Sequence, residues 1–387
     1  MKCTKYLINK FDVLTTRKTI NYQNTKLKTV NLINIIDMFL QYYTFFNKDS
    51  IKLNSRILKQ LYTSQYVKYL DYLIENNFIV LWKNYSVGYK SKTFKLHSSA
   101  KKSKIYSINI DIPDRLYNKI KLINMSSNSH VEDWLKQKLI DDLYKININL
   151  TKVKQWLNNN QLDEKSYLVN LTACTKIYNK DIYYSFDNYG RFHTNFTVLK
   201  KEIRNKYLKF GENNIKEIDI INSQPFFLYI LMKKYGFNDF DGFDIDVLNG
   251  TIYDKIASIS GKTRKEVKPN IYSVLFGKNL SKTFWNKLFG DLYPNVYLWL
   301  KEYKTINKSY KIIAQELQFI ESDFIFNNLI PNILLYNPTL PIITIHDSII
   351  IPDYAYDNVL SIFNTTKQQL LNNELKLKKY SRIYDYA

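Results

Sequence analysis

The sequence has few of the residues that build disulfide frameworks or zinc sites. Only two cysteines, Cys3 and Cys174, and four scattered histidines occur among its 387 residues. Neither a disulfide scaffold nor a Cys/His zinc site is therefore predicted, and a bound metal would have to be held by carboxylates. Nine glycines and eight prolines are too few to predict a long flexible linker.

Long hydrophobic runs are missing as well. No stretch of about 18 consecutive apolar residues occurs that would span a membrane. The first residues, MKCTKYLINKFDVLTTRK, lack the apolar core and the cleavage site of a secretory signal. We therefore expect a protein that is not secreted, does not enter a membrane and works inside a cell, in the cytoplasm of a bacterial or virus-infected host or in an organelle matrix.

Acidic residues are outnumbered by basic ones. The chain holds 56 Lys and Arg against 35 Asp and Glu, a formal net charge of +21. Residues 1–110 alone hold 19 basic and 5 acidic residues, which leaves +14 in that segment. A field of this sign favours polyanions, so nucleic acid is the predicted partner. The abundance of Lys, Asn, Ile, Tyr and Phe, which have A/T-rich codons, suggests the genome of a mobile element, virus or organelle.

The basic N-terminal segment follows the order helix, turn, helix, hairpin. Hydrophobic spacing predicts helices at 55–60 and 64–75 and extended runs at 78–82 and 93–96. The loop between the two extended runs carries Gly88, Lys90 and Lys92. This order is typical of a winged helix, so we predict a winged-helix-like nucleic-acid-binding domain over residues 1–100. The alternative is a helical pair that only packs on the rest of the chain.

Two aspartates in apolar surroundings are the first candidates for chemistry. In IKEIDIINSQP (215–225), Asp219 lies between two isoleucines. A carboxylate in an apolar strand is costly to bury alone, so Asp219 predicts either a bound cation or a structural pairing with Lys or Arg. PIITIHDSIIIP (341–352) predicts a hairpin, or a strand interrupted at its apex, with Asp347 at that apex. Asp347 is either part of a simple polar turn or a second metal ligand that faces Asp219.

A helix that begins at Thr263 carries a third pattern. Thr263 and Glu266 fit a capping box. Two cations and two aromatic residues follow at every fourth position and share a slowly drifting face: Arg264, Lys268, Tyr272 and Phe276. Cations near a helix N-terminus, followed by flat rings, suit a triphosphate followed by a sugar and a base. A purely structural stripe would more often be aliphatic.

Together these segments resemble the family A DNA polymerases and the bacteriophage-type single-subunit RNA polymerases. The helix matches the fingers pattern Arg-x3-Lys-x3-aromatic-x3-aromatic-Gly with Gly277 at its end, and Asp219 and His346-Asp347 match the first and last palm motifs. The remaining matches are Tyr189-Gly190-Arg191 with Arg204, similar to the family's Gly-Arg segment, and Gln315, Gln318 and Glu321, similar to its Gln-bearing palm helix. The resemblance covers about residues 181–352, in the family's order.

The resemblance implies an α+β fold and a polymerase function. We expect a right-hand palm with an antiparallel sheet over residues 181–387, with helical fingers at about 230–290, and a helical connector or thumb-like element over residues 101–180. The implied activity is that of a template-directed nucleotidyltransferase, a small DNA polymerase or primase-polymerase. Its partners would be a DNA template-primer and (d)NTPs, and it would use two-metal phosphoryl transfer.

Residue roles follow from the same resemblance. Two Mg²⁺ ions, or Mn²⁺ in their place, would be held by Asp219, Asp347 and the Ile220 carbonyl. The implied nucleotide-binding residues are Arg264, Lys268, Tyr272, Phe276, Gly277 and Gln224, with Lys268 also protonating the leaving group. The implied nucleic-acid contacts are Arg191, Arg204, His346 and Gln318.

The chain departs from the family at its sugar filter. Gln224 stands where the DNA polymerases have Glu, and Phe276 stands where the RNA polymerases have Tyr, so weak sugar discrimination is predicted. Two alternatives remain open, a minimal single-subunit RNA polymerase and a non-catalytic DNA-binding replication initiator with a relic palm. Retention of Asp219 and Asp347 together with Arg264 and Lys268 argues against the relic, since a dead site has no need of them.

Overall fold

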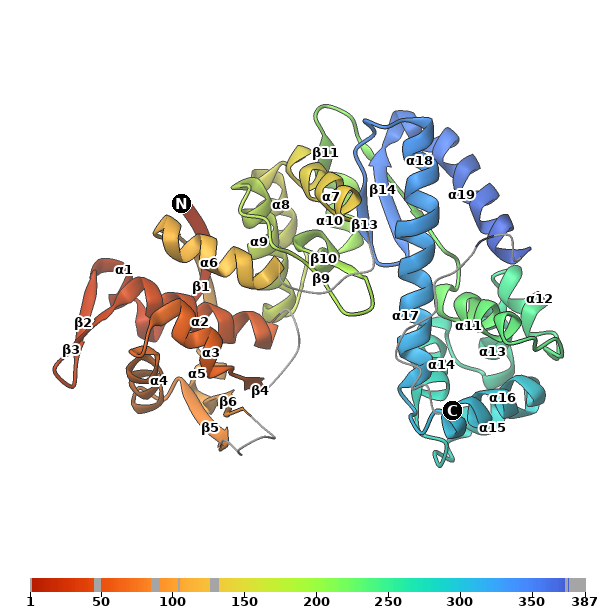
Figure 1. Cartoon of the computed structure of the whole chain (residues 1–387), viewed down its shortest axis with the longest axis horizontal. Helices are drawn as coiled ribbons and strands as arrows, with labels where there is room; N and C mark the ends of the chain where they lie inside the picture. Colours follow the sequence, from red (N-terminus) through yellow and green to blue (C-terminus); the bar gives the residue numbers. More distant parts are fainter. Residues whose placement is uncertain are drawn as a thin grey trace. The chain divides into compact units, whose positions relative to one another are not determined.

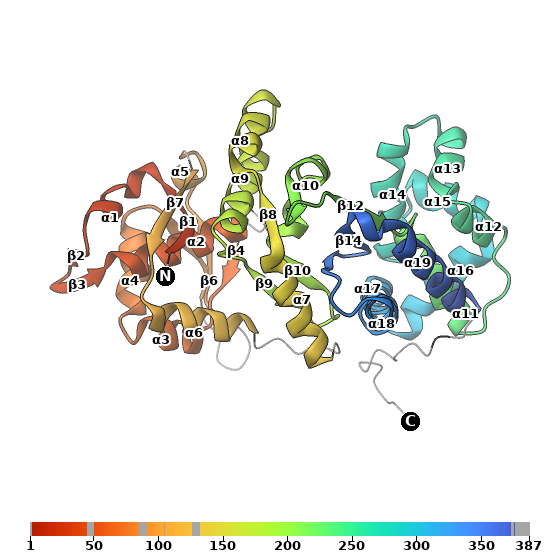
Figure 2. The ribbon, with the colours of Figure 1, turned by 90° about the horizontal axis from the view of Figure 1, so that it is seen from above.

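The computed structural model describes residues 2–44, 50–84, 91–103, 105–125, 132–372 and 375. The chain forms two compact units, each of which mixes helices with small sheets (Figures 1 and 2). The first unit comprises residues 1–127, 143–185 and 193–214, and the second comprises residues 128–142, 186–192 and 215–387. The predicted α+β class is confirmed. No helix in the described part of the chain is both long and apolar enough to cross a membrane.

The first unit contains most of the N-terminal half. Its strands are β1 (Lys2–Ile8), β2 (Thr19–Tyr22), β3 (Thr25–Lys28), β4 (Ser50–Lys52), β5 (Ile79–Lys83), β6 (Thr93–Leu96), β7 (Ile105–Asp111), β8 (Ile146–Ile148) and β11 (Leu208–Phe210). Its helices are η1 (Asn9–Phe11), α1 (Val13–Thr16), α2 (Thr29–Thr44), α3 (Ser55–Tyr62), α4 (Tyr66–Glu75), α5 (Ser98–Lys101), α6 (Asp114–Met125), α8 (Leu150–Asn159), α9 (Glu164–Tyr178), η2 (Asn195–Val198) and α10 (Lys201–Tyr207).

Sheets in the first unit are small and are held together by one shared core. The strand pairs are β1 with β7, β2 with β3 and β8 with β11, all antiparallel, and a three-stranded sheet has the order β4-β6-β5. Helix α2 supplies much of the core because it is apolar nearly all round, and Leu168 of α9 joins the same cluster. The core of this unit is therefore not confined to residues 1–100.

The helix and hairpin predictions for the N-terminal segment are confirmed at the level of elements. Helix α3 covers the predicted 55–60, and α4 begins at Tyr66 within the predicted 64–75. Strands β5 and β6 match the predicted extended runs at 78–82 and 93–96 to within one residue. Asn54 caps α3 by accepting a hydrogen bond from the Arg56 amide at 2.9 Å. Gly88 and Lys90, predicted to lie in the hairpin loop, fall outside the described residues.

The second unit contains the segment with the predicted chemistry. Its strands are β12 (Ile215–Asp219), β13 (Ile343–Ile345) and β14 (Ser348–Pro352). Its helices are α11 (Ser223–Lys234), α12 (Phe243–Leu248), α13 (Ile252–Ser260), α14 (Arg264–Phe276), α15 (Phe284–Leu292), α16 (Pro294–Ile306), α17 (Ile312–Phe324), η3 (Ile325–Leu329), α18 (Ile330–Tyr336), η4 (Asp353–Ala355) and α19 (Tyr356–Leu371). The chain passes between the units at α7 (Asp133–Lys145) and at the pair β9 (Tyr184–Phe186) and β10 (Phe192–Thr194).

One long helical stretch runs through the second unit. Helices α17 and α18 lie end to end in Figure 1 and are joined by η3, which is a π-helical turn. Pro331 stands just inside α18. A proline there has no N–H to donate, and its ring clashes with the carbonyl four residues earlier, so the wider π turn is the local solution that keeps the helix continuous.

The sheet of the second unit has the order β12-β14-β13, with both pairs antiparallel. The predicted hairpin at 341–352 is therefore confirmed as β13 and β14. Helix α7 fixes the segment before β13, because the Lys138 ammonium donates to the Leu340 carbonyl at 2.8 Å and the buried Asp142 carboxylate accepts from the Ile342 amide at 2.9 Å. The strand expected around Asp219 ends at that residue, and α11 begins four residues later.

Candidate active site

The two candidate aspartates meet at one end of the three-stranded sheet. In the register of β12 and β14, Asp219 lies directly opposite Ser348, which is the residue after Asp347. The carboxylate of Asp219 is exposed at the end of its strand, and that of Asp347 is half-buried. The expectation that Asp219 is buried within an apolar strand is therefore wrong, because β12 stops at Asp219 and only its isoleucine neighbours are buried.

A tight turn presents the second aspartate. Ile345 pairs with Ser348, so His346 and Asp347 form a two-residue loop between β13 and β14. His346 has φ of 53°, which is the left-handed conformation required at the first position of such hairpin loops. That conformation is uncommon for a residue with a Cβ, and strained residues of this kind tend to cluster at functional sites.

A buried acid on α17 lies beside this end of the sheet. Glu321 is 1% exposed, and its carboxylate accepts hydrogen bonds from Arg191 Nε at 2.8 Å and from Gln224 Nε2 at 3.0 Å. Burial raises the pKa of Glu321 to about 7, the Arg191 guanidinium opposes that rise, and Asp347 adds to it. The effect of Asp347 on this pKa means that the two carboxyl groups belong to one electrostatic site.

The loop from Asp187 to Arg191 is locked onto the same helix. The Asp187 carboxylate accepts from the backbone amides of Tyr189 and Arg191, and the Tyr189 hydroxyl accepts from Gln315 Nε2 at 2.9 Å. The Arg191 guanidinium forms an ion pair with Glu321 at 2.7 Å. Gln315, Gln318 and Glu321 stand at successive third positions of α17, so one face of the helix carries this whole polar cluster.

Helix α14 turns its cations and rings outward. Its buried face consists of Val267, Ile271, Val274 and Leu275. Arg264 and Lys268 are exposed, and Tyr272 and Phe276 are half-exposed, on the remaining surface. The Lys268 ammonium lies 5.8 Å from the centre of the Tyr272 ring, and the Tyr272 and Phe276 rings are also 5.8 Å apart. The capping box predicted from Thr263 and Glu266 is confirmed.

Arg264 links this helix to the start of α11. Its guanidinium donates to the Asn222 side-chain carbonyl at 3.2 Å and forms an ion pair with Asp254. Asn222 lies three residues after Asp219 and has φ of 54°, a conformation that asparagine tolerates better than most residues. Sequence reasoning did not find Asn222 or Asp254, although an Asn that follows a strand and precedes a helix is a recognisable turn signal.

The chain matches no protein-family model, and no curated protein is significantly similar to it.

Some predicted residues belong to the other unit or have a separate structural reason for their identity. Arg204 is in the first unit, is 7% exposed and donates to the Leu199 carbonyl at 2.6 Å, so local packing accounts for it. A Cβ at Gly277 would come within 2.3 Å of the Ser273 carbonyl oxygen, so the end of α14 itself requires a glycine. Gln318 is half-buried on α17.

The donor set at the sheet end is a pair of carboxylates. Among the residues that the structure describes, no three His, Cys, Asp or Glu side chains cluster as a metal site. Asp219 and Asp347, with the Ile220 carbonyl that follows the first of them, offer hard oxygen donors of the kind that Mg²⁺ prefers. Such sites take their remaining ligands from water and substrate phosphates, so two carboxylates fit this ion.

Proposed function

We propose that the second unit catalyses template-directed addition of nucleotides to a nucleic-acid end, as a small DNA polymerase or primase-polymerase. The observation that carries the proposal is the strand register that places Asp219 opposite Ser348 and so beside Asp347. Two acids far apart in the sequence thus reach one end of one sheet. The three-stranded sheet would be the palm, and α12 to α16 would be the fingers.

Asp219, Asp347 and the Ile220 carbonyl are the residues that would hold two Mg²⁺ ions. When bound, such ions activate a 3′-hydroxyl and neutralise the charge of a leaving pyrophosphate. Asp219 is exposed and Asp347 is half-buried, so ions held by them would also be able to contact a substrate phosphate. The hairpin loop that carries Asp347 also carries His346, which would contact a primer terminus.

Helix α14 would bind the incoming nucleotide. Arg264 is held by Asn222 and Asp254 close to the turn that follows Asp219, so a triphosphate would replace Asp254 as its anionic partner. Lys268 lies one turn further along and would donate a proton to the leaving pyrophosphate. The half-exposed Tyr272 ring offers a surface on which a base would stack.

Glu321 would set the shape of the site without contacting the reacting atoms. Its carboxylate orients both Arg191 and Gln224. Arg191 is thereby committed to an internal ion pair, and this makes it a positioning residue in the proposal. The resemblance alone implied that Arg191 contacts the duplex backbone.

The first unit supports a role in nucleic-acid binding. The order α2, β4, α3, α4, β5, β6 with the sheet order β4-β6-β5 is that expected of a winged helix. One face of α4 is covered, however, by the β2-β3 hairpin, since Lys68 donates to Gln23 and the Tyr22 hydroxyl donates to Glu75. We therefore assign the DNA-binding surface to α3 and the β5-β6 hairpin, which expose Arg56, Lys59, Lys83, Lys92 and Trp82.

A single assay tests the proposed activity. Primed and unprimed DNA templates are each offered dNTPs or NTPs with Mg²⁺, and extension is followed on a gel. We expect extension of the primed template. DNA binding without any extension, under Mg²⁺ and Mn²⁺, would favour the replication initiator with a relic palm.

Sugar discrimination is expected to be weak and to depend on Gln224. Its Nε2 is held by Glu321, which leaves the rest of the amide to pair with a ribose 2′-hydroxyl. Wild type should use dNTPs and NTPs within about 100-fold of one another, because one such contact supplies roughly 5- to 150-fold. Gln224→Met should lower NTP use relative to dNTP use, measured as the ratio of kcat/KM values.

Gln315→Met is the matched control for this prediction. It removes an amide of the same size from the same cluster, where that amide holds Tyr189, and should leave the ratio unchanged. A glutamate at position 224 is a poor test, because it would place a second carboxylate against the buried Glu321. Wild-type selectivity above about 10⁴-fold for either sugar would show that another residue sets the choice.

DNA binding is expected to depend steeply on salt through α3 and the β5-β6 hairpin. Replacing Arg56, Lys59, Lys83 and Lys92 together with Gln should reduce the slope of log K against log salt by up to about 3.6, since each lost phosphate contact on a duplex removes about 0.9. Fluorescence anisotropy of a labelled duplex at several salt concentrations measures this slope.

The control variant carries the same loss of charge elsewhere on the first unit. Lys18, Lys26, Lys152 and Lys154 are all exposed, and changing these four to Gln should leave the slope nearly intact. Equal slopes for the two variants would refute the assigned surface. Deleting residues 1–110 is unsuitable, because Leu116 of α6 and Leu168 of α9 pack in the core that those residues largely build.

A further inference from the structure

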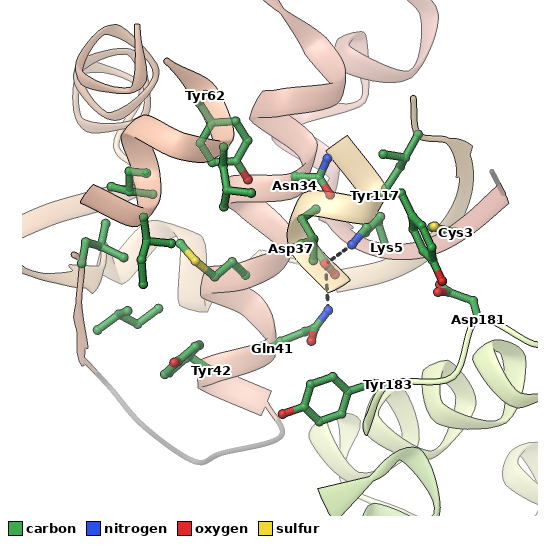
Figure 3. Close-up of a pocket in the computed structure, with 18 of the residues that line it drawn as sticks. Cys3, Lys5, Asn34, Asp37, Gln41, Tyr42, Tyr62, Tyr117, Asp181 and Tyr183 are labelled. Carbon is green, nitrogen blue, oxygen red and sulfur yellow. Dashed lines mark hydrogen bonds and ion pairs between the residues drawn. The ribbon is translucent and has the colours of Figure 1, made fainter. Parts of the chain in front are cut away.

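The first unit contains a cavity that the proposed polymerase activity does not use. Its volume is about 390 Å³, which lies at the low end of the range of about 300–1,000 Å³ for small-molecule sites. Much of its wall is apolar or aromatic: Met38, Ile51, Leu58, Tyr42, Tyr62, Tyr117 and Tyr183 all line it. Figure 3 shows these tyrosines around a group of polar side chains. An apolar cavity with a few convergent polar groups is the usual form of a ligand site.

A buried amide in this cavity lacks a partner for its oxygen. Asn34 is 4% exposed and its Nδ2 donates to the Val30 carbonyl at 2.9 Å. Its Oδ1 has no hydrogen-bond partner among the described residues. A buried acceptor without a donor is destabilising by about 1–3 kcal/mol. A ligand with an N–H group at this place would satisfy it.

The charges in the cavity are balanced. Asp37 accepts from the Tyr6 amide at 2.8 Å and from Gln41 at 2.7 Å, and it forms an ion pair with Lys5 at 3.1 Å (Figure 3). Lys176 and Asp181 also line the cavity, so two cations stand beside two anions. Burial lowers the pKa of Lys176, and Asp37 opposes this shift. A ligand that is itself an anion gains little from such a neutral interior.

The mouth of the cavity differs from its interior. Lys52 of β4 lines the cavity and is exposed. A ligand with a neutral polar head and an anionic tail would therefore place the tail toward Lys52 and the head toward Asn34. The head must be planar enough to lie among the tyrosines, and its edge must carry both donors and acceptors for Asn34 and Lys176.

We propose that this cavity binds a single nucleobase, with the base edge toward Asn34 and the sugar and phosphate toward Lys52. A nucleobase is planar and uncharged, stacks on aromatic rings, and carries donors and acceptors along one edge. The base would come either from a free nucleotide or from an unpaired position of a DNA strand. Because the site lies in the first unit, its binding is separable from catalysis at Asp219 and Asp347.

The test measures binding of nucleosides to the full chain. The four nucleosides are titrated by calorimetry into the Asp219→Asn protein, which should not turn over nucleotides, with deoxyribose 5-phosphate as the probe that lacks a base. We expect at least one nucleoside to bind and deoxyribose 5-phosphate not to bind. Asn34→Leu should weaken nucleoside binding about tenfold or more, because one buried hydrogen bond is lost.

Two further variants guard against a trivial loss of binding through misfolding. Asn31→Leu removes an equal amide from the same helix, where it donates to the Tyr69 hydroxyl outside the cavity, and should bind nucleosides as before. Ile57→Trp changes a partly exposed lining residue and should fill the cavity and block binding. Thermal melting checks that each variant is folded.

Oligonucleotides distinguish the two sources of the base. A short single strand is compared with the same strand that carries one abasic position, and weaker binding of the abasic strand assigns the site to DNA. Equal binding of the two strands, with nucleosides still bound, assigns it to free nucleotides. The proposal is overturned if no nucleoside binds up to about 10 mM, if deoxyribose 5-phosphate competes equally well, or if folded Asn34→Leu and Ile57→Trp both bind like wild type.

Discussion

Asp219→Asn and Asp347→Asn are each expected to abolish nucleotide addition, with a loss of at least about 10³-fold in rate. The two carboxylates lie at the end of the sheet where β12 pairs with β14, and loss of either would remove several kcal/mol of charge stabilisation from phosphoryl transfer. Asparagine keeps the size of the side chain, so the fold and DNA binding should survive. Single-nucleotide extension of a labelled primer measures the rate.

Asp353 provides the matched control. It follows directly after β14, at the opposite end of the strand that Asp347 precedes, and Asp353→Asn changes the charge of the same sheet by the same amount. That variant should retain activity within a few-fold. Activity of either Asp219→Asn or Asp347→Asn close to wild type, with Mg²⁺ as the only divalent ion, would end the assignment of this sheet end as the active site.

Glu321→Leu is expected to destabilise the protein by about 3–5 kcal/mol, because it leaves the Arg191 guanidinium largely buried without its anion. Arg191→Met should cost less near neutral pH. Burial already raises the pKa of Glu321 to about 7, so this carboxyl can take up a proton when its cation is removed, whereas the guanidinium cannot lose one. Urea denaturation of both single variants and the double variant measures these differences.

The pH dependence of stability has a definite sign. The pKa of Glu321 is higher in the folded protein than its ordinary value, so the folded state binds the proton more tightly than the unfolded state does. The Glu321 carboxyl makes its whole contribution to stability below the ordinary Glu pKa and loses that contribution as pH rises through about 7. Glu321→Gln should flatten the pH dependence of stability between pH 5 and 8. Midpoints of urea denaturation, measured at several pH values for both proteins, test this.

An exposed ion pair serves as the control for these stability changes. The Lys136 ammonium lies 3.3 Å from the Asp133 carboxylate on α7, and the Asp133 side chain is fully exposed. Asp133→Leu should therefore leave the urea midpoint nearly unchanged. Similar losses for Asp133→Leu and Glu321→Leu would show that the buried cluster around Glu321 has no special role in stability.

The sequence predicted the local elements well because their signals are local. The hairpin around Asp347 follows from two β-branched runs, and the start of α14 follows from the capping box at Thr263. The exposure of Asp219 was not predicted, since it depends on where β12 ends. That end is set by Asn222, whose left-handed conformation turns the chain into α11.

Contacts between residues far apart in the chain could not be predicted from the sequence. Nothing in the spacing of residues indicates that Glu321 pairs with Arg191 and Gln224, because these three come from three separate elements. The same holds for the β2-β3 hairpin that covers α4. Its turn at Gln23 and Asn24 has positive φ at both positions, as the tightest hairpins require. These two residues are not the Asn-Gly or Asp-Gly pair that usually marks such a turn.

The pairing of β12 with β14 also orders events during synthesis of the chain. Asp219 is synthesised before α11 to α18, whereas β14, the strand next to Asp347, is synthesised after all of these helices. The two ends of this long segment can pair only when β14 has left the ribosome, and closing so large a loop is slow compared with forming its helices. A nascent chain would therefore carry a folded first unit for some time before Asp219 and Asp347 are brought together.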